Sequence, residues 1–242
     1  MFRLVESGDN AITVYLADQP GDQALARVVS FCAQAREVMA HHLQDLVPSY
    51  CSVTLYFDVL RSDFYSVRRL VRGIADRLDT ETMPTVTGDP ADESGTSVGK
   101  VHVLPVYYGQ DAAMDMARVA QVSGLTAEQI IATHSTQRYR VYALGFRPGF
   151  AFMGETPARL RVPRLEVPRK RVPAGAVAIA GTQAAIYPSA SPGGWNIIGR
   201  CPTTLFSCPS GEPKVLLGVG DVVQFQPISR QAFLDKGGRL HE

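Results

Sequence analysis

Val177-Ala178-Ile179-Ala180 is a short apolar stretch typical of a buried strand, and it lies within a turn-rich segment, residues 145–211. That segment contains 9 Gly and 9 Pro. Glycine and proline interrupt regular elements and favour turns, so the segment predicts short strands joined by tight turns. Short strands with dense turns indicate a β-barrel or a compact β-sandwich.

Further elements are predicted on the N-terminal side of this segment. Residues 101–106 and 138–144 have the composition of strands. Between them, Thr126 and Gln129 have the Thr-x-x-Gln spacing of a capping box, which predicts that a short helix begins there. Residues 100–242 are therefore predicted to form a mainly-β domain.

The N-terminal part of the chain has a different pattern. Residues 11–16 and 52–57 alternate with period two and predict strands. Each is followed by apolar residues at helical spacing, in residues 25–39 and 64–78. This βαβα order, with two amphipathic helices, predicts an α+β domain over residues 1–83 in which both helices cover one face of a sheet.

Residues 84–99 are small, polar and turn-forming, and they predict a linker between the two domains. The end of this stretch, Gly95-Thr96-Ser97-Val98-Gly99-Lys100-Val101, invites comparison with a phosphate-binding loop. That motif requires Gly at position 94 and Ser or Thr at position 101, where this chain has Ser94 and Val101. The chain therefore has no recognisable nucleotide-binding loop.

Composition excludes several classes of protein. The 242 residues include 24 Lys+Arg and 23 Asp+Glu, and this near-zero net charge gives no overall attraction to nucleic acid or anionic lipid. No apolar stretch approaches the ~20 residues of a membrane span, and the first residues lack the apolar core of a signal peptide. We therefore expect a cytoplasmic protein with neither a nucleic-acid nor a membrane partner.

The sequence gives little support for self-contained hydrolysis. Gly95-Thr96-Ser97-Val98-Gly99 fits the letters G-x-S-x-G, but it lies in the predicted linker and not between a strand and a helix, as a serine hydrolase requires. The 5 His residues are not in a metal-ligand spacing such as H-E-x-x-H, so we expect no metal site. His134 lies at the predicted end of a helix, where it either caps the last carbonyls or projects into a cleft as a proton carrier. No hydrolase of a familiar kind is predicted from this chain alone.

Two stretches could bind a ligand. Residues 159–171 contain six positive charges and one carboxylate, which indicates either a solvated face or an anion site built from guanidinium groups. Ser191-Pro192-Gly193-Gly194-Trp195 predicts a type II turn that presents the only tryptophan. The indole ring either walls a ligand pocket or plugs one end of the barrel.

Several Gly/Pro motifs occur in series in the second half of the chain. They are Gly145-Phe146-Arg147-Pro148-Gly149-Phe150, Val172-Pro173-Ala174-Gly175, Ile186-Tyr187-Pro188, Ser191-Pro192-Gly193-Gly194-Trp195 and Ile198-Gly199-Arg200. In order and spacing they resemble the B subunit of bacterial ATP-dependent 5-oxoprolinase, whose family includes proteins called allophanate hydrolase subunit 1 and the sporulation kinase inhibitor KipI. The resemblance implies an α+β N-terminal domain followed by a mainly-β, cyclophilin-like barrel.

The resemblance also implies a reaction and partners. The chain would be one part of a complex that opens 5-oxo-L-proline to L-glutamate with ATP and Mg. It would be inactive without a homologue of the C subunit, of the KipA or allophanate hydrolase subunit 2 type, and without a homologue of the A subunit. Two alternatives remain open. One is a KipI-like regulatory module that inhibits a sensor histidine kinase, and the other is a subunit of an allophanate or urea-type amidohydrolase.

Matched positions give a candidate site. His134 would be the acid or base, and Arg169 would hold a carboxylate or phosphate. We predict that these two residues face one cleft, because a neutral histidine beside a fixed cation suits an amide-activating reaction.

Four further positions complete the predicted site. Gln183 and Tyr187 would hydrogen-bond a lactam or amide, and Trp195 would lie beside the ligand cleft. Arg200, in the last matched motif, is a further candidate for binding substrate or an anion.

Overall fold

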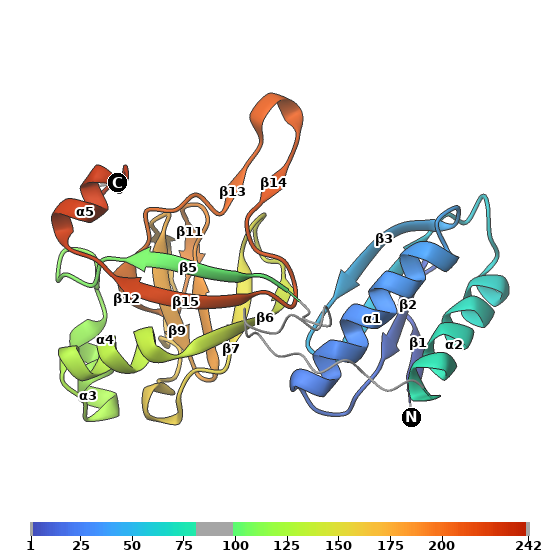
Figure 1. Ribbon diagram of the computed structural model, residues 1–242, viewed down its shortest axis with the longest axis horizontal. Helices are drawn as coiled ribbons and strands as arrows, with labels where there is room; N and C mark the ends of the chain where they lie inside the picture. Colours follow the sequence, from blue (N-terminus) through green and yellow to red (C-terminus); the bar gives the residue numbers. More distant parts are fainter. Residues whose placement is uncertain (1, 81–98, 241–242) are drawn as a thin grey trace. The chain divides into compact units, whose positions relative to one another are not determined.

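A computed structural model describes residues 2–80 and 99–240 (Figure 1). The chain divides into two compact units, Met1–Gly99 and Lys100–Glu242. The predicted linker at residues 84–99 lies outside the described residues except for Gly99. None of the described helices is long and apolar enough to cross a membrane.

The first unit is a four-stranded antiparallel sheet with two helices on one face (Figure 1). The sheet order is β1-β2-β4-β3, and the elements are β1 (Arg3–Glu6), β2 (Ala11–Tyr15), α1 (Asp22–Val38), β3 (Leu43–Pro48), β4 (Ser52–Phe57) and α2 (Phe64–Thr80). Ile12 of β2 lies opposite Leu55 of β4. Both pack in one buried cluster with Phe31 of α1 and Val71 of α2, which explains why the helices share a face.

The predicted βαβα order of this unit is wrong, because the observed order is ββαββα. Strands β1 and β3 form the two edges of the sheet. Both are largely exposed or half-buried, and among their residues only Leu46 is buried. An edge strand that buries so little needs no regular apolar alternation, so the sequence carried no period-two signal for these two strands.

The second unit is built on a seven-stranded sheet that nearly closes into a barrel. Its order is β12-β9-β10-β7-β6-β15-β5, with β5 (Val101–Val106), β6 (Arg138–Leu144), β7 (Ala151–Gly154), β9 (Ala176–Ala180), β10 (Gln183–Ile186), β12 (Asn196–Arg200) and β15 (Val222–Pro227). Tyr107, just after β5, exchanges backbone hydrogen bonds of 2.9 and 2.8 Å with Arg200 at the end of β12. The first and last strands of the sheet therefore meet, as a barrel requires.

Smaller elements surround this sheet. They are α3 (Met116–Ser123), α4 (Ala127–Thr136), η1 (Ala158–Leu160), β8 (Arg169–Val172), β11 (Ser191–Gly193), β13 (Phe206–Ser207), η2 (Pro209–Gly211), β14 (Lys214–Val215) and α5 (Arg230–Asp235). Strands β13 and β14 form a hairpin that projects from the barrel (Figure 1). The predicted capping box is present, because Thr126 and Gln129 bond each other's backbone amides at the start of α4.

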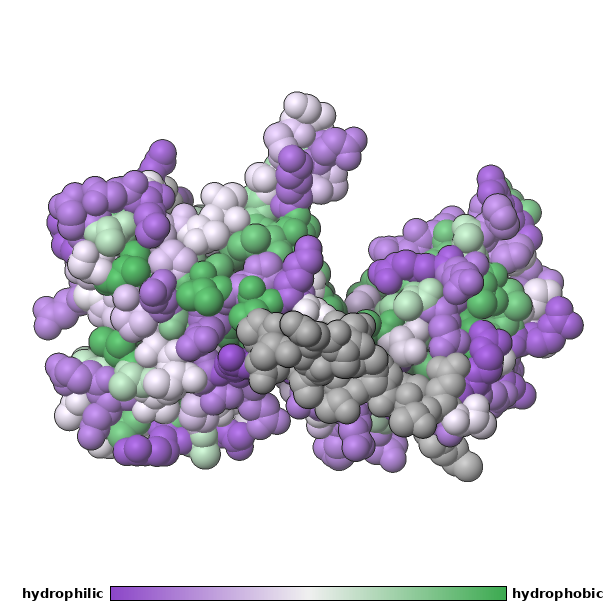
Figure 2. Space-filling view, in the orientation of Figure 1, coloured by the Kyte–Doolittle hydropathy of each residue, from purple (hydrophilic) through white to green (hydrophobic). Residues whose placement is uncertain are grey.

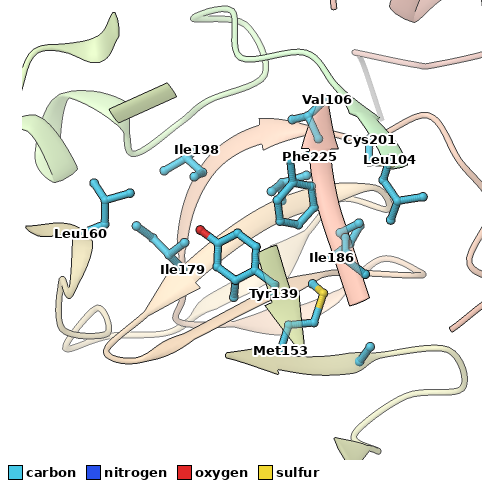
Figure 3. Close-up of a cluster of buried hydrophobic side chains, with 14 of the residues drawn as sticks. Leu104, Val106, Tyr139, Met153, Leu160, Ile179, Ile186, Ile198, Cys201 and Phe225 are labelled. Atoms are coloured by element: carbon cyan, nitrogen blue, oxygen red, sulfur yellow. The ribbon is translucent and has the colours of Figure 1, made fainter. Parts of the chain in front are cut away.

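Side chains fill the interior of the barrel (Figure 3). Tyr139, Met153 and Phe225 are at most 1% exposed, and the rings of Tyr139 and Phe225 lie 5.3 Å apart. A small barrel packed in this way has no space for a ligand along its axis. Any ligand site in this unit must therefore lie beside the main core.

The outer surface is mixed in character. Hydrophilic side chains cover much of the face seen in Figure 2, and apolar residues gather over β5 and β15 of the second unit. Val101 and Val103 of β5 are 36% and 55% exposed. Apolar atoms make up a large share of any protein surface, so this feature alone identifies no site.

Candidate functional site

A cavity of about 530 Å³ opens beside a second, smaller apolar cluster of the barrel unit. Its walls come from four segments: the β6–β7 turn with β7, the loop before β8, the β9–β10 hairpin with the residue after it, and β11 with the two residues that follow. The lining contains five aromatic rings and two long polar side chains among prolines, glycines and an alanine. These seven side chains are Phe146, Phe150, Phe152, Tyr187, Trp195, Arg164 and Gln183.

Phe150 is the centre of the aromatic wall. Its ring makes edge-to-face contacts with Phe146 at 5.3 Å, Tyr187 at 5.3 Å and Trp195 at 5.8 Å between centroids. Phe152 contacts both Phe150 at 4.8 Å and Trp195 at 6.1 Å. Edge-to-face contacts hold each ring in a defined orientation, so this wall is formed before any ligand binds.

The stretch around Trp195 forms a strand where the sequence predicted a type II turn. Ser191–Gly193 is β11, which pairs with β8 through an irregular register. A Cβ at Gly193 would lie 2.3 Å from the Tyr187 hydroxyl, so glycine is needed for this close approach. The approach places Trp195, which is 7% exposed, against Phe150 at the cavity wall.

Tyr187 is held as a neutral phenol. Burial raises its pKa, while a backbone hydrogen bond from Trp195 and the nearby guanidinium groups of Arg164 and Arg169 act in the opposite direction. Its side chain is 2% exposed although it lines the cavity. The Tyr187 ring therefore serves mainly as wall, with its hydroxyl directed at the backbone of the Trp195 segment.

Arg164 supplies positive charge to the cavity. Its side chain is exposed and belongs to the lining. Within residues 2–80 and 99–240 its guanidinium pairs with no carboxylate. A guanidinium at the edge of an apolar cavity is well suited to bind a carboxylate or phosphate group of a ligand.

Arg169, the predicted anion-binding residue, is paired within the protein. Its Nη2 lies 2.5 Å from Oδ1 of Asp115, and Oδ2 of Asp115 accepts a 2.7 Å hydrogen bond from the Ile197 amide. Asp115 is only 4% exposed. The contact connects β8 to the start of α3 and to β12, so the structure gives Arg169 a role in holding elements together.

His134 does not reach the cavity. It is 0% exposed, its Nδ1 lies 2.8 Å from the Tyr108 hydroxyl, and its ring stacks on Phe225 at 4.4 Å. Burial lowers its pKa to about 3, so the imidazole is neutral. The prediction that His134 and Arg169 face one cleft is therefore wrong, because Ile130 and His134, four positions apart, share the buried face of α4.

Arg200 also lies away from the aromatic cavity. Its side chain is 3% exposed, and Nη1 donates a 2.7 Å hydrogen bond to the carbonyl oxygen of Arg239. Together with Thr203 and Thr204 it lines a separate cavity of about 220 Å³. The structure thus brings together Gln183, Tyr187 and Trp195 of the predicted site residues, and leaves His134, Arg169 and Arg200 elsewhere.

Among the cavity residues that sequence reasoning missed are three aromatic residues and one arginine. Phe146 and Phe150 were visible as the two aromatic positions of the Gly-Phe-x-Pro-Gly-Phe motif, and Arg164 was one of several cations in the basic stretch. Nothing in the sequence singled out Phe152, which lies in β7. Among the described residues, no three His, Cys, Asp or Glu side chains are placed to hold a metal ion.

The walls, the cation and the amide form a candidate small-molecule site beside a barrel. Comparison with known proteins gives the family of the chain. The family model described as "Carboxyltransferase domain, subdomain C and D" matches residues 2–217, and the chain belongs to this family. The chain is 31% identical over 235 residues to the B subunit of 5-oxoprolinase from Bacillus subtilis (strain 168), and the match covers 96% of this chain and 95% of that protein. The predicted resemblance to the family of 5-oxoprolinase B subunits is confirmed.

Solved structures show the same fold. The structure of TTHA0988 is 33% identical with a TM-score of 0.73, and the match covers 95% of this chain but 40% of that one. Kluyveromyces lactis urea carboxylase matches at 16% identity with a TM-score of 0.74, over 96% of this chain and 22% of that one. This chain is therefore similar to one part of each of two longer proteins.

Proposed function

We propose that this chain is the B-type subunit of a complex that uses ATP to open 5-oxo-L-proline to L-glutamate, and that it works in the cytoplasm. Similarity over almost the whole length of a protein named as the B subunit of 5-oxoprolinase supports the assignment. The observation that carries the proposal is the aromatic cavity with Arg164 and Gln183 at its lining. The cyclophilin-like kind of barrel and the division into two domains around residues 84–99 are parts of the same proposal.

The chemistry of 5-oxo-L-proline matches this lining. The compound is a five-membered lactam ring with a carboxylate, so its ring faces fit between aromatic walls and its carboxylate fits the guanidinium of Arg164. The Gln183 side-chain amide has both a donor and an acceptor, which are the two functions needed to bind a lactam N–H and C=O. Ring, charge and amide are thus each matched by a different residue type.

The size of the cavity favours a composite site. At about 530 Å³ it lies in the range of cavities that hold drug-sized ligands (~300–1,000 Å³), so 5-oxo-L-proline alone would leave it partly filled. We assign the remaining space to groups from a partner protein or to phosphate from ATP. A composite site explains why a chain without a phosphate-binding loop would belong to an ATP-dependent enzyme.

The partners are proposed from the family. The match covers 40% of the TTHA0988 chain, so the rest of that protein is larger than the part that resembles this chain. We assign the corresponding role here to a homologue of the C subunit, of the KipA or allophanate hydrolase subunit 2 type, together with a homologue of the A subunit. ATP and Mg would bind in the assembled complex, and this chain alone would be inactive.

The test is reconstitution of the complex. The three purified subunits are mixed with MgATP and 5-oxo-L-proline, and both ADP and L-glutamate are measured. Product should form only when all three subunits and ATP are present, and L-proline, which lacks the lactam carbonyl, should give none. If the three subunits form a stable complex that leaves 5-oxo-L-proline intact, the proposed reaction is wrong.

A further inference from the structure

Phe146 occupies a strained turn at the cavity. The Arg147 amide donates a 2.8 Å hydrogen bond to the carbonyl oxygen of Gly145, which closes a three-residue γ-turn around Phe146. The φ angle of Phe146 is 66°, in the left-handed region. Turns of this hand are rare and strained, and a bulky residue in this region is an outlier.

The ring of Phe146 is also exposed. It is 61% accessible to solvent, and it contacts the edge of Phe150 while lining the cavity. Glycine would adopt the same turn without strain and would remove an exposed aromatic ring from the surface. Strained residues of this kind cluster at ligand sites.

We propose that Phe146 is the wall of the cavity that determines specificity, and that its exposed ring packs against the apolar face of a flat, ring-shaped ligand that carries an anionic group. This inference rests on the proposed function and names its substrate class. A lactam ring has CH₂ groups that pack against an aromatic face, whereas a linear amide such as allophanate has none. Phe146 therefore selects cyclic over linear amide substrates, while Arg164 binds the carboxylate.

Two glycine substitutions separate strain from function. Phe146→Gly removes both the strain and the ring. Ser210→Gly is the matched control, because among the described residues Ser210 is the other non-glycine residue with positive φ, at 55°, and it lies in η2, outside the cavity lining. Ser210→Gly should raise the thermal unfolding midpoint by about 2–4 °C through relief of backbone strain, and Phe146→Gly should raise it by less because it also loses the edge contact with Phe150.

Ligand binding should distinguish the two variants. Calorimetry with the full chain and with the assembled complex would use 5-oxo-L-proline, 2-furoate as a flat ring carboxylate, and N-acetyl-L-alanine as an open-chain amide acid. Phe146→Gly and Phe146→Ala should weaken binding of both ring compounds roughly three- to tenfold, as expected for loss of one stacking contact. Ser210→Gly should bind like the unchanged protein, and the open-chain compound should bind more weakly to all of them.

The outcomes separate this inference from the proposed function. If the complex opens 5-oxo-L-proline and Phe146→Gly leaves both its KM and ring binding unchanged, the role of Phe146 is overturned and the proposed function stands. If the complex does not act on 5-oxo-L-proline but 2-furoate binding still depends on Phe146, the reaction is wrong and the role of Phe146 stands. Absence of ring binding by both the chain and the complex would overturn the inference.

Discussion

Two aromatic clusters of the barrel unit contain similar side chains and differ in accessibility. Around His134, the rings of Tyr108, Tyr139 and Phe225 are 8% exposed or less and make close contacts with the imidazole. Around Phe150, the rings leave an open cavity beside them. The first, or closed, cluster stabilises the barrel. The second, or open, cluster forms a surface on which a ligand can bind.

The difference follows from the backbone around each cluster. His134 is on a regular helix that packs against strand β15, so side chains fill the space between the two elements. The Phe150 cluster is built by loops and short strands rich in glycine and proline, in which side chains do not pack as regularly as between a helix and a strand. A titratable group is therefore a poor marker of a site unless the surrounding backbone leaves room for a ligand.

The largest expected effect concerns the closed cluster. His134→Ala should lower the free energy of unfolding by about 3–5 kcal/mol, because it opens a cavity among packed rings. Urea unfolding followed by circular dichroism measures this change. A variant that folds as stably as the unchanged protein, yet forms a complex without activity, would show that His134 acts in the reaction and that the comparison is wrong.

In the open cluster, Arg164→Ala should weaken 5-oxo-L-proline binding about ten- to hundredfold, as expected for loss of a charge-assisted contact worth ~1.5–3 kcal/mol. Stability should change by less than ~0.5 kcal/mol, since the side chain is exposed. Arg171→Ala is the matched control, because Arg171 is an exposed arginine of the same basic stretch outside the cavity lining. Equal losses of affinity in the two variants, measured by calorimetry, would show that the basic stretch acts through its overall charge and not through Arg164.

The pH dependence of stability tests the closed cluster again. Burial lowers the pKa of His134 from its ordinary value near 6.5 to about 3. Between these values the unfolded chain binds a proton that the folded chain does not, so this residue makes stability fall as pH falls below about 6.5. His134→Phe has no proton to bind, and its loss of stability between pH 7 and pH 5 should be smaller by about 2 kcal/mol.

Denaturant unfolding at several pH values measures the difference in stability between the unchanged protein and His134→Phe. Carboxyl groups titrate in both proteins, so their contribution cancels in this difference. Parallel pH profiles for the two proteins would mean that His134 is solvated.

A smaller effect is expected at Gln183. Gln183→Ala should weaken 5-oxo-L-proline binding roughly three- to tenfold, since it removes a hydrogen bond between neutral groups worth ~0.5–1.5 kcal/mol. Thr182→Ala is the control, because Thr182 is adjacent, exposed and outside the cavity lining. If Thr182→Ala has the larger effect on the calorimetric affinity, the amide-binding role belongs to another residue.

Much of the fold could be predicted because local signals agreed with tertiary packing. Residues 138–144 were predicted as a strand and form β6, and the capping box at Thr126 begins α4. The edge strands β1 and β3 could not be predicted, because strands that bury little leave no periodic pattern. Closure of the barrel could not be predicted either, since it depends on a backbone pair between Tyr107 and Arg200, far apart in sequence.

The site was predicted less completely, for a related reason. The position of Trp195 at the cavity follows from the glycines before it, which are visible in the sequence. Whether Arg164 or Arg169 faces a ligand depends on Asp115, which neutralises Arg169 from 54 positions away. The burial of His134 likewise depends on Tyr108, which supplies its hydrogen bond from another part of the fold.

The most direct measurement is a fluorescence titration of Trp195, the only tryptophan of the chain, with 5-oxo-L-proline. If the Phe150 cluster is the ligand site, emission should change saturably, with an affinity that matches calorimetry, is weakened in Arg164→Ala and is unchanged in Arg171→Ala. If calorimetry detects binding while Trp195 emission stays constant to saturation, the ligand binds elsewhere and the assignment of the cavity is contradicted.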